Sequence, residues 1–127
     1  MQEQLSAGKR LLVAEDNPIN LLVVTRFLES FGYEFDAVEN GLDCLKLLSE
    51  ITYDLVLTDI AMPGMDGIQV ATELRAMADV RCDIPVIAMT ANVELAATQR
   101  FLDAGINEVL AKPFSKAELQ SCIKKWL

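Results

Sequence analysis

Short apolar runs alternate with amphipathic stretches along the whole 127-residue chain. The apolar runs have strand length, and the amphipathic stretches repeat apolar residues at the spacing of one helix face. The run at 33–38 alternates only partly, which suits an edge strand. Strictly alternating elements predict an α/β fold in which a parallel sheet carries helices on both faces. Strands are expected at 11–14, 33–38, 55–57, 85–89 and 108–111, and helices at 18–31, 41–50, 68–74, 93–104 and 116–126.

Residues at the ends of the expected helices support these boundaries. Asn17 can cap the first helix, and Pro18 suits its first position, where a missing N–H costs nothing. Asn92 is expected to cap the fourth helix. Ser115 and Glu118 have the spacing of a capping box before the last one.

Composition excludes several classes of function. A formal net charge of −8 argues against binding to nucleic acid or to an anionic membrane, since either needs a basic patch. The chain has no histidine, which excludes imidazole catalysis and a phosphohistidine within it. No apolar run is long enough to span a bilayer, and the N-terminus does not resemble a signal peptide. The length suits one domain, at residues 9–127, after a polar tail at 1–8.

Three cysteines indicate a reducing environment. Cys44, Cys82 and Cys122 are widely spaced and form no CxxC pair, so a disulfide framework is not expected. We expect them to be small core or half-buried residues of a cytoplasmic protein.

Polar side chains lie where the expected strands end. Glu15 and Asp16 follow the first strand, Asp59 the third, Thr90 the fourth and Lys112 the fifth. The carboxyl ends of parallel strands meet at one edge of the sheet, where ligands bind in open α/β folds. Each residue alone would more often be a solvated charge, a turn former or a helix cap. The prediction of a site depends on all of them falling at strand ends of the same sheet.

The three carboxylates imply a cation. Crowded carboxylates repel one another unless a proton or a cation neutralises them. Ligand sets made only of oxygen favour Mg²⁺ or Mn²⁺ over zinc, and Mg²⁺ commonly binds one or two carboxylates together with phosphate oxygens. We therefore expect Asp16 to hold the metal with help from Glu15, and Asp59 to be the nucleophile of a phosphoryl transfer.

The other polar groups would bind the phosphoryl group. Lys112 is expected to pair with Asp59 or with a phosphoryl oxygen. The Thr90 hydroxyl and the Ala91 backbone N–H are expected to donate further hydrogen bonds.

Four segments, in order, resemble the receiver domain of two-component response regulators. They are residues 12–17 (LVAEDN), 59–67 (DIAMPGMDG), 85–91 (PVIAMTA) and the stretch from 105 to 114. The DxxMPxMDG pattern is highly specific, and the resemblance extends from about Lys9 to the end of the chain.

The resemblance implies a flavodoxin-like (CheY-like) fold whose five parallel strands have the order 2-1-3-4-5. It implies that Asp59 takes a phosphoryl group from the phosphohistidine of a histidine kinase or a histidine phosphotransfer protein. Glu15, Asp16, Asp59 and the backbone carbonyl of Ala61 match the positions that bind Mg²⁺ (or Mn²⁺) in the family. Such a domain switches or relays a signal and is not itself an enzyme.

Further expectations follow from the same resemblance. Thr90 and Lys112 match the family's hydroxyl and lysine, and the Lys112–Pro113 bond is expected to be cis. The run EDNPIN at 15–20 is similar to receivers of hybrid histidine kinases. A weak dimer that forms on phosphorylation is left open.

One position departs from the family. Many receivers carry Tyr or Phe three residues before the lysine, and the ring turns inward on phosphorylation. Val109 occupies this position here, and valine has one stiff torsion and no ring. We expect a weaker conformational switch, which would suit a relay that passes the phosphoryl group on. Leu95 and Val109 are candidates for the surface that changes.

Three rival functions fit the residues less well. A phosphohydrolase with an aspartyl nucleophile usually needs a second acid two residues later, where this chain has Ala61. A pseudo-receiver that only binds proteins would lack one of the acids or the lysine, and all are present. A flavin carrier needs a phosphate-cradling loop after the first strand, where this chain has Asp16-Asn17-Pro18.

Overall fold

A single parallel sheet organises the part of the chain that the computed structural model describes, residues 8–91 and 94–127. Its order is β2-β1-β3-β4-β5, as expected, and the partly alternating strand β2 lies at one edge. β3 and β4 are buried along their whole length, which explains why their sequences are apolar without alternation. The strands are β1 (Arg10–Ala14), β2 (Glu34–Val38), β3 (Leu55–Asp59), β4 (Val86–Thr90) and β5 (Glu108–Ala111).

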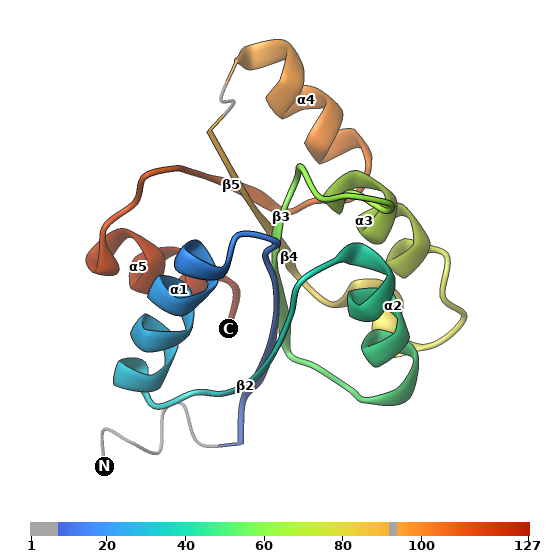
Figure 1. The fold of residues 1–127 in the computed structure, drawn as a ribbon. Coiled ribbons are helices and arrows are strands. Elements are labelled where there is room, and N and C mark those ends of the chain that lie inside the picture. Colours follow the sequence, from blue (N-terminus) through green and yellow to red (C-terminus); the bar gives the residue numbers. More distant parts are fainter. Residues whose placement is uncertain (1–7, 92–93) are drawn as a thin grey trace.

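Helices cover both faces of the sheet (Figure 1). They are α1 (Pro18–Phe31), α2 (Gly41–Glu50), α3 (Gly67–Arg75), α4 (Leu95–Asp103) and α5 (Lys116–Trp126), with a short 3₁₀ helix, η2 (Val80–Asp83), before β4. α1 and α5 lie on one side of the sheet, α2 and α3 on the other, and α4 projects at the top of the view. The predicted α/β architecture is therefore confirmed.

The sheet separates two apolar cores. Val24 and Leu28 of α1 pack with Leu119 and Ile123 of α5 against one face. On the other face, apolar residues of α2, α3 and α4 pack together with Tyr53. Alternate residues of each strand enter alternate cores, because successive strand side chains point to opposite faces.

Most of the expected helix caps are present. The Asn17 side chain accepts hydrogen bonds from two backbone N–H groups of the first turn of α1, and Pro18 is the first residue of this helix. Ser115 and Glu118 form the expected capping box of α5. The expected cap Asn92 lies outside the described residues. α4 is described from Leu95 to Asp103, one residue short of the expected C-terminal end.

The cysteines have the expected environments. Cys44 and Cys122 are buried, Cys82 is half-buried, and all three are free thiols. Burial raises the pKa of the Cys44 thiol to about 12, which keeps this group protonated and unreactive at neutral pH. Within the described ranges, no helix combines the length and the apolar character needed to cross a membrane.

The guanidinium of Arg75 forms hydrogen bonds at the amino-terminal edge of the sheet, opposite the strand ends that carry Glu15, Asp59 and Lys112. Its Nη1 donates to the carbonyl oxygens of Cys82 (2.9 Å) and Ile84 (2.7 Å). Its Nε and Nη2 donate to the carbonyl oxygen of Gly105 at 3.0 and 2.7 Å, and Nη2 also donates to Asn107 Oδ1 at 2.7 Å. One side chain therefore joins the end of α3 to the segments before β4 and β5.

Replacing Arg75 with lysine should lower the free energy of unfolding by about 2–4 kcal/mol. An ammonium cannot reproduce a planar fork of donors, so partly buried carbonyl groups would lose their partners. Arg81→Lys is the matched control, because Arg81 makes a single ion pair with Asp79, at 3.3 Å. Its cost should stay within about 0.5 kcal/mol. Equal losses in urea unfolding of the two variants would contradict this role of Arg75.

Candidate functional site

Three carboxylates meet at the carboxyl edge of the sheet. Glu15 and Asp16 directly follow β1, and Asp59 is the last residue of β3. One carboxylate oxygen from each residue lies within 4.8 Å of the others. Glu15 and Asp59 are buried, whereas Asp16 is exposed. The predicted convergence of these acids is confirmed.

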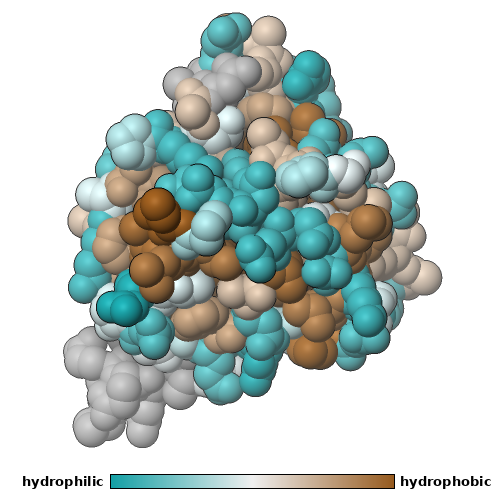
Figure 2. Space-filling model, in the orientation of Figure 1, coloured by the Kyte–Doolittle hydropathy of each residue, from teal (hydrophilic) through white to brown (hydrophobic). Residues whose placement is uncertain are grey.

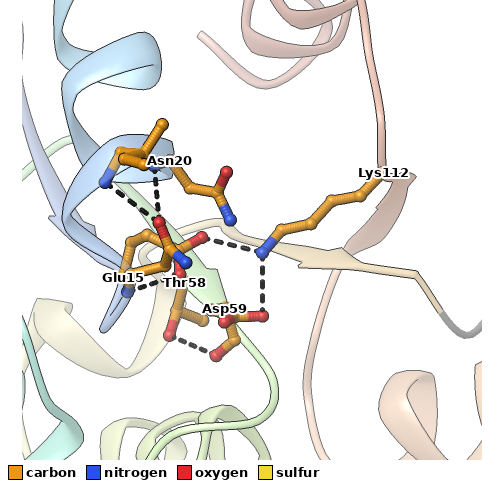
Figure 3. Close-up of polar contacts among 7 residues, drawn as sticks. Glu15, Asn20, Thr58, Asp59 and Lys112 are labelled. Atoms are coloured by element: carbon orange, nitrogen blue, oxygen red, sulfur yellow. Dashed lines mark hydrogen bonds and ion pairs between the residues drawn. The ribbon is translucent and has the colours of Figure 1, made fainter.

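Glu15 is almost completely buried and has partners for both of its carboxylate oxygens. The side chain is 1% exposed. Its Oε2 accepts a hydrogen bond from the backbone N–H of Asn17 at 3.2 Å, and its Oε1 accepts one from Lys112 Nζ at 2.7 Å (Figure 3). The Asn17 side chain also caps α1, so the same residue starts the helix and holds the carboxylate.

Lys112 bridges the two buried acids. Its ammonium reaches from the end of β5 to Glu15 and also lies 3.3 Å from Asp59 Oδ1 (Figure 3). Burial alone would lower the pKa of Lys112. The hydrogen bond to Glu15 and the charges of both acids outweigh burial and raise this pKa above its ordinary value. The lysine therefore remains charged, and its shorter contact is with Glu15.

The surroundings of Asp59 disfavour the ionised form of its carboxyl group. Burial and the nearby charge of Glu15 raise the pKa of Asp59 from 3.8 to about 6, although Lys112 acts in the opposite direction. The carboxyl is still largely ionised at neutral pH and is available as a nucleophile.

The remaining predicted residues lie at the neighbouring strand ends. Thr90 is the buried last residue of β4, and its carbonyl accepts a hydrogen bond from the Lys112 backbone N–H at 2.9 Å. Ala91 lines a cavity of about 410 Å³ together with Glu15 and Lys112. The Lys112–Pro113 bond is cis, as expected. Ala61 is exposed, two residues after Asp59.

Sequence reasoning missed three features of the site. It expected Lys112 to pair with Asp59 but not to make its shorter contact with Glu15. It treated Asn17 only as a helix cap. It also overlooked Thr58, whose buried hydroxyl donates to the Asp59 carbonyl oxygen at 2.9 Å. The only signal for Thr58 was its place directly after the apolar run that ends at residue 57 and directly before Asp59.

The arrangement fits a hard divalent cation. The exposed Asp16 and the buried Asp59 both offer carboxylate oxygens, and the repulsion among three acids exceeds what a single lysine neutralises. No histidine or cysteine belongs to the cluster, so its ligand chemistry is that of Mg²⁺-type sites.

Asp59→Asn should stabilise the metal-free protein by about 1–2 kcal/mol near neutral pH, because it removes one buried like charge. A carboxyl with a raised pKa binds more protons when folded than when unfolded. Its cost to stability is therefore present above about pH 6 and fades as the pH falls toward 3.8. Urea unfolding in a chelator should show a clear gain at about pH 7.5 and a smaller one at about pH 5.

The control for this measurement is Asp103→Asn, which changes an exposed carboxylate of α4 bonded to Gln99. This variant should show no such pH-dependent gain. A loss of stability in Asp59→Asn at the higher pH would contradict the electrostatic account.

Comparison with known proteins identifies the family. The model of the response regulator receiver domain matches residues 11–124. Sensor protein GacS of Pseudomonas syringae pv. syringae is 37% identical over 123 residues, which are 95% of this chain and 14% of GacS. Hybrid signal transduction protein dokA of Dictyostelium discoideum is 38% identical over 98% of this chain and 7% of its own length. The chain thus spans less than a fifth of these two relatives.

A solved structure supports the same conclusion. The receiver domain of sensor histidine kinase PA1611 from Pseudomonas aeruginosa PAO1, with a magnesium ion coordinated in its active site cleft, superposes with a TM-score of 0.87 at 38% identity. The match covers 94% of this chain and 98% of the other. With the fold, the acid cluster and the lysine all in place, the chain belongs to the response regulator receiver domains of two-component and phosphorelay signalling.

Proposed function

We propose that Asp59 accepts a phosphoryl group from a phosphohistidine of a histidine kinase or a histidine phosphotransfer protein. The observation that carries this proposal is the position of the Asp59 carboxylate, 3.3 Å from the Lys112 ammonium and within 4.8 Å of the carboxylates of Glu15 and Asp16 at the carboxyl edge of the sheet.

The reaction is a direct displacement at phosphorus. An oxygen of the Asp59 carboxylate forms a bond to phosphorus while the phosphorus–nitrogen bond of the phosphohistidine breaks. The electrons of that bond leave with the imidazole nitrogen, and Asp59 becomes an acyl phosphate. Little covalent chemistry is required of other side chains, because phosphoryl transfer depends mainly on positioning and on neutralising charge.

Asp16, Asp59 and the Ala61 carbonyl would hold Mg²⁺, with Glu15 close behind them. Mn²⁺ is the alternative ion with similar oxygen preference. The bound ion supplies positive charge that neutralises the transferring phosphoryl oxygens. The donor set supports this assignment, and so does the magnesium ion of the PA1611 receiver domain.

Lys112, Thr90 and Ala91 would bind the phosphoryl group once it is attached. The Lys112 ammonium would exchange its contact with Asp59 for a phosphoryl oxygen, while the Thr90 hydroxyl and the Ala91 N–H would donate to the others. These new contacts favour one conformation around Thr90 and Ala91, which is how a local charge becomes a signal.

The response at the α4–β5 surface would be small. Val109 is half-buried and packs against the core beneath α2, α3 and α4, where it has no ring to reorient. Leu95, the first residue of α4, is 85% exposed, whereas Val109 packs against the core. A receiver of this kind is better suited to relaying the phosphoryl group than to holding an active shape.

The partner would approach over the first turns of α1. Ile19, Leu22 and Val23 are exposed on the helix that begins beside Glu15. Figure 2 shows apolar surface gathered over this part of the molecule. An apolar patch bordering a charged site suits a protein donor better than a free metabolite.

We further propose that the domain works in the cytoplasm, as a signalling module and not as an enzyme with its own substrate turnover. Its relatives include Hybrid signal transduction protein dokA, and we infer a hybrid-kinase context for this chain. The acidic net charge of −8 speaks against nucleic acid or membrane as a direct ligand of this domain.

Incubation with acetyl phosphate and Mg²⁺ should add the mass of one phosphoryl group to the wild-type protein. The gain should vanish in Asp59→Asn and in a chelator, and persist in Asp103→Asn. Intact-mass spectrometry measures it, and light scattering of the same samples tests for a weak phosphorylation-dependent dimer. No gain under any condition, or a gain retained in Asp59→Asn, would refute the proposal.

Mg²⁺ at ten times its dissociation constant should raise the melting temperature by about 3–6 °C, because a ligand that binds only the folded state stabilises it. The shift should be much smaller for Asp16→Asn and unchanged for Asp103→Asn. A full shift in Asp16→Asn would exclude Asp16 as a ligand.

A further inference from the structure

The backbone of the proposed nucleophile is held by its neighbour in the chain. Thr58 is fully buried, and its Oγ1 donates to the Asp59 carbonyl oxygen at 2.9 Å (Figure 3). The peptide group that follows Asp59 is therefore hydrogen-bonded to the side chain of Thr58, which lies on the opposite face of β3 from the Asp59 carboxylate.

The same carbonyl is confined from a second side. A Cβ built on Gly67 would lie only 2.5 Å from the Asp59 carbonyl oxygen, so any residue with a side chain at the start of α3 would clash with this backbone. The Gly67 N–H also donates to the Ile60 carbonyl at 2.9 Å. Thr58 and Gly67 together restrict the peptide plane from which the Asp59 carboxylate extends.

Packing alone does not explain a hydroxyl at this position. Thr58 pairs with Ala14 of β1 and with Ala88 of β4, and both alanines belong to the apolar core beneath α2 and α3. Val56, two residues earlier on the same face of β3, also belongs to that core. Valine would suit this environment, since burying a hydroxyl costs free energy unless the hydroxyl is hydrogen-bonded.

We infer that Thr58 is a positioning residue for phosphoryl transfer, and that its hydroxyl orients the Asp59 peptide so that the carboxylate faces both Lys112 and the metal-binding acids. This inference rests on the proposed function. Its physical basis is that reactivity depends on holding the attacking atom within about 0.5 Å of its productive position, and side chains on strands are held best by neighbouring hydrogen bonds.

Two substitutions separate the hydroxyl from the packing. Thr58→Val keeps the shape and removes the hydroxyl, and Thr58→Ser keeps the hydroxyl and removes a methyl group. The rate of Asp59 phosphorylation by acetyl phosphate, in saturating Mg²⁺, should fall about five- to tenfold in Thr58→Val and stay within about twofold of wild type in Thr58→Ser. Stability should rank in the opposite order, with Thr58→Ser the less stable variant because it loses buried methyl contacts.

The Mg²⁺-induced shift in melting temperature should be unchanged in Thr58→Ser and smaller in Thr58→Val, since a misplaced Asp59 carboxylate would bind the proposed metal less well. Thr58→Val reacting as fast as wild type would overturn the inference, and so would equal slowing of the two variants, which would indicate packing and not the hydroxyl. If the wild-type protein itself gains no phosphoryl group, the proposed function falls and this inference falls with it. If wild type is phosphorylated and Thr58→Val keeps pace, only this inference fails.

Discussion

The repulsion among three carboxylates at one edge of the sheet governs the structure of the site. Glu15 and Asp59 are both buried, and Lys112 is the cation that lies between them. Burial strengthens the repulsion and the attraction alike, because a low dielectric magnifies every charge interaction. The result is a site that is incompletely neutralised, with the unfavourable charge concentrated on Asp59. Such a site has a physical reason to attract a divalent cation and, with it, a phosphoryl group.

The fold brings these charges together at little cost to itself. Parallel strands end at a common edge, so residues more than forty positions apart become neighbours without any irregular backbone inside the cores. Stability lies elsewhere, in the two apolar layers and in the Arg75 hydrogen bonds. Because of this separation, the edge with the acid cluster can keep its unfavourable charge repulsion while hydrogen bonds hold the opposite edge in place.

Contacts close to the acids serve both structure and chemistry. Asn17 caps α1 and holds Glu15 through its backbone N–H, so the helix beneath the exposed apolar patch is anchored to the charged site. Thr58 and Gly67 constrain the peptide of Asp59. Val109, in contrast, offers no moving ring near the site. These features together suit the proposed role of Asp59 as a phosphoryl acceptor in a domain that changes shape only slightly.

The spacing of apolar residues and the helix-capping and turn residues were enough to predict the five strands, and the family resemblance supplied their order. The sequence also predicted that Glu15, Asp16, Asp59 and Lys112 would gather, because the carboxyl ends of parallel strands lie at one edge of the sheet. Asn92 lies outside the described residues, so its capping role stays a prediction. Which acid Lys112 approaches more closely, and where the Thr58 hydroxyl points, depended on side-chain distances of a few tenths of an ångström that no residue pattern encodes. Local sequence therefore determined the elements and the chemistry available to them, whereas tertiary packing decided which atoms meet, since hydrogen bonds and charge pairs form only where burial and geometry bring distant side chains into contact.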